Sequence, residues 1–332
     1  MRVLFPKARS PFNLLNAWHL AGLVALILLC VYSYNISTFW LRIITGTLMW
    51  IGMAQSWNII AGYTGYINFG HCAFLGVGAY TTGILMVRGI PFWPAMILGG
   101  IFAAILALII GIPTLRLRGS YFAIATWALA ETIRQLALSL EITGGAYGIR
   151  LPPFLNEYYF FVIMLVLCLF TLASSYLIYE KSFFGYHVRA IRENELAARS
   201  LGINTVRVKV ASFAYSAFIP GLFGGAYAFW LTYIHPDNVL HPVMTDQAVV
   251  MALLGGLGTY AGPVLGAILL WWIRRLIWVF LGAETYYFIL LGLLIMFVVA
   301  FMPDGIMGLI RRRKISFNIK ENIARWKEKL SA

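Results

Sequence analysis

Residues 180–209 read EKSFFGYHVRAIRENELAARSLGINTVRVK, and this charged stretch lies between two long apolar segments. It predicts a helix, because alanine favours helices and two alanines, Ala197 and Ala198, stand side by side. Gly202 is suited to end that helix, since glycine adopts the left-handed conformation common at helix ends. A charged helix between membrane segments is typical of a surface that meets a soluble partner. The pattern therefore favours a transport subunit driven from outside itself over a self-contained enzyme.

The rest of the chain has the composition of a membrane protein. It is 61% hydrophobic and 11% charged, whereas soluble domains carry about 25% charged residues. About 20 apolar residues cross a bilayer as a helix. Six runs approach that length, namely 17–34, 38–60, 92–113, 158–179, 260–281 and 286–302. Shorter or glycine-broken candidates lie at 67–87, 119–139, 208–233 and 245–257. The sequence therefore predicts an all-α polytopic membrane protein with about ten transmembrane helices.

The basic residues indicate the orientation of the chain. Nineteen of 25 fall in the N-terminal tail, around Arg116, in the stretch 180–209 or after residue 310. Ten crossings with both termini inside place all of these on one side, which the positive-inside rule makes the cytoplasm. The acidic residues expected on the outer side are Glu141, Glu157, Asp237, Asp246 and Glu284. The net charge of +13 is thus explained by topology, and nucleic-acid binding is not expected.

These features predict three parts. Residues 1–16 form a basic cytoplasmic tail without an apparent cleavage site after the first apolar segment, and residues 17–310 form the transmembrane domain, which contains the charged cytoplasmic loop 180–209. External loops are expected at 143–157 and 234–246. Residues 311–332 form a basic amphipathic tail suited to anionic lipid headgroups. The single cysteines read as small hydrophobic residues.

The sequence contains no ATP-binding motif and no cluster of catalytic residues. It contains no G-x-x-x-x-G-K-[ST] phosphate loop, no H-E-x-x-H motif and no Cys/His cluster. We therefore expect a non-enzymatic chain that binds no cofactor or metal itself and is driven by partners. A self-sufficient secondary carrier or channel is the alternative, although no chain of intramembrane acidic residues supports it. A membrane enzyme ranks lowest.

Several polar residues inside apolar segments are candidates for a translocation path, because charges in lipid are costly. The candidates are Asn58, Asn68, His71, Tyr80, Glu131 and Arg134. Each also has a structural interpretation. Glu131 and Arg134 can pair as neighbours three residues apart at the outer end of a helix. The histidine and the amides can bond within or between helices.

Three glycines recur every four residues, at Gly258, Gly262 and Gly266. On a helix they form a smooth face that lets a neighbouring helix approach closely. The sequence therefore predicts a helix-packing seam, with a glycine hinge as the alternative.

The sequence Ala197-Ala-Arg-Ser-Leu-Gly202 resembles the A-A-x-x-x-G core of the coupling loop of bacterial ABC import permeases. In many of these a glutamate directly precedes the alanines, whereas here Leu196 holds that place and Glu195 lies one residue earlier. The resemblance implies that an ATPase docks here. The implied coupling residues are Arg192, Glu195, Ala197, Ala198 and Gly202.

Further blocks resemble the M-type permease subunit of branched-chain amino-acid ABC importers, over roughly residues 45 to 310. The most specific are GHCAFLGVGAY at 70–80 and TLRLRGSYFA at 114–123, joined by RAIREN at 189–194, LGGLG at 254–258, GPVLGA at 262–267 and MPDG at 302–305. The family implies a second related permease, two cytoplasmic ATPases and an extracytoplasmic binding protein, in a bacterial or archaeal plasma membrane.

The resemblance implies branched-chain or related hydrophobic amino acids as cargo. Urea, short amides and aromatic acids are alternatives, because Tyr66 and Asn68 stand where many amino-acid permeases have Gln and Ser. In such machines closure of the ATPases moves the coupling helices. The substrate path then opens alternately to the two sides, between two permease chains.

Overall fold

The computed structural model describes residues 37–117, 119–281, 289, 292, 293, 296 and 305–310. Both predicted tails, the predicted span 17–34 and most of 286–302 lie outside this part of the chain. The long helices are α2 (Thr38–Asn58), α3 (His71–Val87), α4 (Phe92–Thr114), α5 (Ser120–Ser139), α6 (Glu157–Ser175), α9 (Thr205–Leu231), α11 (Pro242–Gly255) and α12 (Gly262–Leu281).

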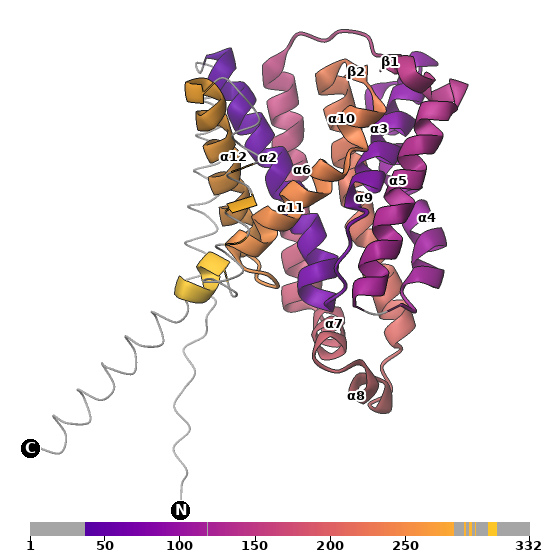
Figure 1. Cartoon of the computed structure of the whole chain (residues 1–332), viewed down its shortest axis with the longest axis vertical. Helices are drawn as coiled ribbons and strands as arrows, with labels where there is room; N and C mark the ends of the chain where they lie inside the picture. Colours follow the sequence, from indigo (N-terminus) through magenta and orange to yellow (C-terminus); the bar gives the residue numbers. More distant parts are fainter. Residues whose placement is uncertain are drawn as a thin grey trace, which may run out of the picture.

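These helices form the membrane bundle that the apolar runs predict (Figure 1). By length and composition, three described segments can cross a bilayer: Phe92–Thr114, Glu157–Lys181 and Gly262–Phe280. α3 is apolar but has only 17 residues. The predicted total of about ten crossings includes residues outside the described part, so it stays a prediction.

The centre of the bundle consists of α3, α4 and α9, which pack closely along their lengths. Glycine permits this contact, because a β-carbon on Gly78 would collide with the backbone of Gly221, and one on Gly224 would collide with the carbonyl of Leu75. α2 packs against α6 and α12 beside this centre, and α11 packs against α12.

The chain between α2 and α3 is irregular. α2 continues into the π-helical turn η1 (Ile59–Tyr63), and residues 64–70 form an irregular segment, with φ +81° at Gly65, before α3 begins at His71. Here Tyr66, Asn68 and Gly70 are buried, while Gly65 and Ile67 are exposed. The segment therefore presents one face to the protein core and the other outward.

Short elements lie between the long helices. They are η2 (Glu141–Thr143), η3 (Gly145–Tyr147), β1 (Ile149–Arg150), η4 (Tyr176–Lys181), β2 (Tyr233–Ile234) and α10 (Pro236–Val239). β1 and β2 pair antiparallel, with Ile149 opposite Ile234. This pairing joins the two loops that were predicted to be external.

The prediction for residues 234–246 is partly wrong. α11 begins at Pro242, a favourable first helical residue, so Asp246 lies inside a helix and not in a loop. The first turn of α11 meets the start of α3, since the backbone N–H of Cys72 donates to Thr245 Oγ1 over 2.8 Å. With 14 residues α11 is about 21 Å long, which is too short to cross a roughly 30 Å hydrocarbon core alone.

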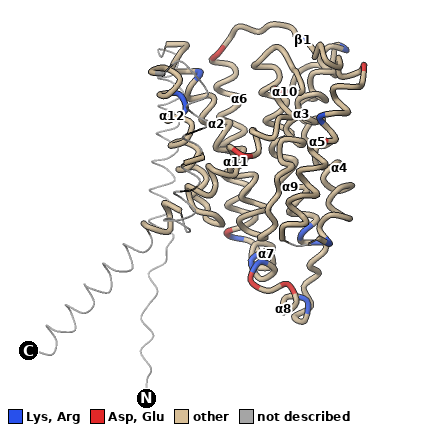
Figure 2. The backbone as a smooth tube through the Cα atoms, viewed as in Figure 1, with Lys and Arg blue, Asp and Glu red and all other residues tan. Residues whose placement is uncertain are grey.

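The stretch 180–209 contains two helices where one was expected. α7 (Phe183–Glu193) and α8 (Glu195–Ser200) lie at one end of the molecule, together with much of its described charge (Figures 1 and 2). They separate at Asn194, whose extended backbone (φ −158°) cannot continue a helix. Its side-chain oxygen accepts the N–H groups of Leu196 and Ala197, which caps α8. Gly202 has φ +83° after α8, as predicted for a helix end.

Candidate coupling site and membrane cavity

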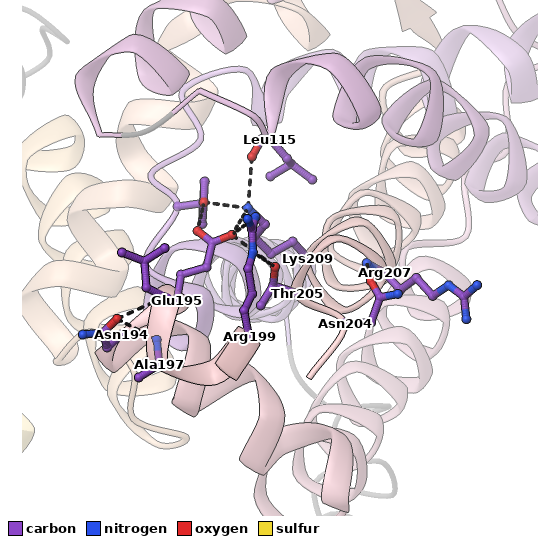
Figure 3. A network of polar contacts seen from close by, with 11 residues as sticks. Leu115, Asn194, Glu195, Ala197, Arg199, Asn204, Thr205, Arg207 and Lys209 are labelled. Atoms are coloured by element: carbon purple, nitrogen blue, oxygen red, sulfur yellow. Dashed lines mark hydrogen bonds and ion pairs between the residues drawn. The ribbon is translucent and has the colours of Figure 1, made fainter. Parts of the chain in front are cut away.

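Glu195 is the centre of a polar network at the base of α8 (Figure 3). Its carboxylate accepts hydrogen bonds from Tyr66 Oη at 3.0 Å, Arg199 Nη2 at 3.0 Å and Thr205 Oγ1 at 3.2 Å. The Glu195 side chain is only 10% exposed. This carboxylate therefore points into its own chain and not toward a docking partner.

Lys209 supplies the positive charge that balances Glu195. Its Nζ lies 2.9 Å from Glu195 Oε1, and it also donates to Tyr66 Oη at 2.8 Å and to the carbonyl of Leu115 at 3.1 Å. The side chain is 5% exposed, and all three ammonium hydrogens have an acceptor within reach. A buried pair with its remaining hydrogen-bonding capacity satisfied can offset the cost of desolvation.

The network connects α8 to three other parts of the bundle: the segment 64–70 through Tyr66, the residue after α4 through Leu115, and α9 through Lys209. A second link starts from α7, where Arg192 Nη1 donates to the carbonyl of Gly62 in η1. These contacts tie α7 and α8 to the region where α2 ends and residues 64–70 begin.

Large apolar side chains on the α7–α8 tip are exposed. Leu196 is 63% exposed and Leu201 is 81% exposed on α8 and the turn after it, and Phe183 is 84% exposed at the start of α7. We call these three residues, with Tyr186, the apolar tip. Sequence reasoning missed them, although four large apolar side chains within a charged stretch were the available signal.

The predicted coupling residues divide between the two sides of the tip. Ala197 and Gly202 are exposed and free to face a partner. Ala198 is 2% exposed and belongs to the main hydrophobic core, so the prediction that it lies in the docking cleft is wrong. Adjacent residues on a helix point about 100° apart. Because α8 packs through Ala198, its neighbour Ala197 faces outward.

A cavity of about 640 Å³ opens on the outward face of the segment 64–70. The residues that line it are Gly65, Ile67, Phe69, Gly119, Ser120, Ala123, Ile124, Trp127 and Asp246. Its walls thus come from the segment 64–70, from Gly119 and the first two turns of α5, and from α11. Tyr66 lies between two lining residues but points the other way, into the Glu195 network.

The predicted path residues do not line this cavity. Asn58 is buried, and its amide group holds the turn before α12 by accepting from Gly258 N at 2.8 Å and donating to Thr259 O at 3.0 Å. Asn68 accepts from Gly70 N within its own segment, and His71 Nε2 lies 2.8 Å from Ser56 Oγ. Tyr80 is 5% exposed within a separate hydrophobic cluster. For the histidine and the amides the structural interpretation fits the geometry.

Glu131 and Arg134 form the predicted pair on α5. Arg134 Nη2 lies 2.8 Å from Glu131 Oε1, and Arg134 Nη1 reaches Asp237 Oδ1 at 2.6 Å. Asp237 lies in α10, so the arginine also ties α5 to the loop between α9 and α11. The pair is thus accounted for by structural contacts.

The expectation of three glycines on one helical face is wrong for Gly258. It lies in the turn before α12 with φ +73°, whereas Gly262 and Gly266 belong to α12. A β-carbon on Gly266 would collide with the backbone of Met251 in α11, which fits the predicted packing seam. Gly258 packs instead against Gly62 and Arg192, beside the second link from α7.

The structure thus shows an all-α membrane protein in which a charged helical tip is linked to a cavity in the bundle. Among the described residues, no group of three or more His, Cys, Asp or Glu side chains could hold a metal ion. The class that fits is a multi-pass transport permease.

Comparison with known proteins identifies the family. Residues 39–299 match the family model described as "Branched-chain amino acid transport system / permease component", and the chain belongs to this family. No solved structure matches.

Relatives include both kinds of permease named for such systems. The chain is 30% identical to the "High-affinity branched-chain amino acid transport system permease protein LivM" of Escherichia coli, over 87% of this chain and 75% of that protein. It is 26% identical to a "Probable branched-chain amino acid transport permease protein LivM" of Methanocaldococcus jannaschii, over 68% and 79%. The LivH permease of Salmonella typhimurium is 28% identical, over 77% and 90%.

Proposed function

We propose that this chain is a transmembrane permease subunit of an ABC importer for branched-chain or related hydrophobic amino acids. It forms the substrate path together with a second, related permease, as the similarity to both LivM and LivH supports. Two cytoplasmic ATPases bind ATP and Mg²⁺ and dock on the α7–α8 tip, and an extracytoplasmic protein delivers the substrate. Both termini lie in the cytoplasm, and the chain itself carries out no chemical reaction.

The observation that carries this proposal is the continuous contact from the tip to the cavity. The apolar tip is a surface to which a soluble partner can bind. Behind it, the buried Glu195–Lys209 pair joins α8 to Tyr66. Ile67 and Phe69, the neighbours of Tyr66 on the other face, line the cavity. Movement of α8 therefore changes the cavity wall directly.

The rigidity of this connection follows from its chemistry. Hydrogen bonds to charged groups contribute about 1.5–3 kcal/mol each, more than neutral ones. Tyr66 takes part in two such bonds, donating to the carboxylate and accepting from the ammonium group. The segment is also tied to the turn before it, since the backbone N–H groups of Gly65 and Tyr66 donate to the carbonyls of Ala61 and Ile60. The wall and the tip then move as one unit.

A charge on the apolar tip tests the docking. Leu201→Asp places a carboxylate on a side chain that is 81% exposed at the tip, and we expect at least a tenfold loss of ATPase subunits that co-purify with the chain. Leu155→Asp is the matched control, because Leu155 is 94% exposed in the loop before α6, outside the tip. It should retain the ATPases within twofold.

Two results would contradict the proposal. Full retention of the ATPases in Leu201→Asp would remove the tip as the docking site. Accumulation of amino acid by the purified chain alone in liposomes, without nucleotide, would show the self-sufficient carrier instead.

A further inference from the structure

Asp246 is the one described acidic residue of α11, and its surroundings differ from those of the other intramembrane charges. It is partly buried and lines the 640 Å³ cavity, whose other lining residues are glycine, alanine, serine and large apolar side chains. No hydrogen bond or ion pair from the described residues reaches its carboxylate. His241, before the first residue of α11, acts on it electrostatically without forming an ion pair.

A carboxylate inside a membrane protein is costly unless a positive group or hydrogen bonds compensate it. Among the described residues, Glu195 and Glu131 have cationic partners within 3.0 Å. The Asp246 carboxylate is therefore able to form an ion pair with a cation that enters the cavity. A metal ion fits poorly, because hard cations need six or more oxygen ligands and no described cluster provides them.

The shape and lining of the cavity restrict the ligand further. A volume of about 640 Å³ is within the roughly 300–1,000 Å³ of small-molecule sites. Phe69, Ile124 and Trp127 offer apolar surface to a hydrocarbon group. A ligand that satisfies both features carries one ammonium group and an apolar side chain. Such a ligand pairs with the carboxylate and buries its hydrocarbon part against α5.

We propose that Asp246 binds the α-ammonium group of the transported amino acid, with the apolar side chain of that amino acid against Ile67, Phe69, Ile124 and Trp127. This inference rests on the proposed function and adds a subsite to it. The second permease closes the open side of the cavity and meets the carboxylate end of the substrate. A single ion pair holds the cargo in orientation and still releases it.

The experiment uses the assembled importer in proteoliposomes with its binding protein and L-leucine. We expect Asp246→Asn to lower the initial rate of ATP-driven leucine uptake at least tenfold while ATP hydrolysis stays within twofold of the wild type. Asp246→Glu keeps the charge and should retain at least a third of the uptake. Glu141→Gln is the control, because it removes an exposed carboxylate in η2.

Three outcomes would overturn the inference. Asp246→Asn could transport leucine at the wild-type rate, or Asp246→Glu could fail as completely as the amide. The second permease could also be lost from the Asp246→Asn complex on purification, which would mean that the carboxylate pairs with that chain and not with cargo. A wild-type importer that accumulates no amino acid with ATP would instead refute the proposed function itself.

Discussion

The network around Glu195 and the cavity around Asp246 both contain a carboxylate in the helical bundle, but the two carboxylates differ in their bonding partners. Glu195 is 10% exposed and is met by a lysine, an arginine, a tyrosine and a threonine, all from this chain. Asp246 faces a cavity and finds no such partner among the described residues. A charge that is fully paired holds a structure in one geometry. A charge without a partner is available to a ligand. We therefore assign transmission of movement to the Glu195 network and recognition of cargo to the Asp246 cavity.

The largest expected effect is on the closed network. Lys209→Met removes the buried cation and leaves the buried Glu195 carboxylate with Arg199, which is 51% exposed, as a cationic partner. Breaking one partner of a buried pair costs about 3–5 kcal/mol. We expect a large fall in the thermal unfolding temperature of the purified protein in detergent. Arg207→Met is the matched control, because this residue is exposed two positions earlier on the same helix. It should have a small effect.

If Lys209→Met proves too unstable to purify, the double variant Glu195→Gln/Lys209→Met tests whether the loss of stability comes from the uncompensated buried charge. Removing both charges should recover much of the lost stability, because no buried charge remains uncompensated. A double variant as unstable as the single one would show that Lys209 acts through packing alone.

Tyr66→Phe should have an intermediate effect. It keeps the ring against Phe122 and removes only the hydroxyl that joins Glu195 and Lys209 to the segment 64–70. We expect a loss of about 1.5–3 kcal/mol in stability, as for hydrogen bonds to charged groups. The more telling readout is leucine transported per ATP hydrolysed, which should fall at least threefold. Tyr147→Phe, at a residue that is 90% exposed, should leave this ratio unchanged.

An unchanged ratio in Tyr66→Phe would show that the tip moves the cavity wall by another route. Arg192, through its contact with Gly62, is the next one to examine.

The smallest expected effect on stability is at Asp246. Asp246→Asn removes a charge without a partner in the described part of the chain, so the unfolding temperature should stay the same or rise by a degree or two. Differential scanning fluorimetry of the purified complex without substrate measures this directly. A fall comparable to that of Lys209→Met would mean that Asp246 is a structural charge, and the distinction between the two regions would disappear.

The sequence predicted the parts of the fold that depend on long apolar runs. The runs 38–60, 92–113 and 158–179 correspond to α2, α4 and α6 within a few residues, because the length of an apolar run determines whether it can cross a bilayer. Gly202 was also recognised correctly, since its left-handed conformation is a local requirement.

The site was predicted less well, because its geometry depends on contacts between distant segments. Composition does not reveal whether Ala197 or Ala198 faces the core, since that depends on how α8 packs against the rest of the chain. Asp246 was assigned to a loop because two prolines precede it, whereas Pro242 in fact starts α11. The bonding partners of Glu195, Tyr66 and Lys209, are 129 and 14 residues away along the chain, and no local sequence pattern indicates them.

The alternating segment 64–70 also constrains how this protein can diverge. Because buried and exposed residues alternate along it, inserting or deleting one residue would place the following side chains on the opposite face. Here such a change would bury Ile67 against the lysine and direct the tyrosine hydroxyl into the cavity. Related sequences are therefore expected to exchange the outward-facing residues of this segment, such as Ile67, to adapt to new cargo, while they keep the tyrosine and the number of residues fixed.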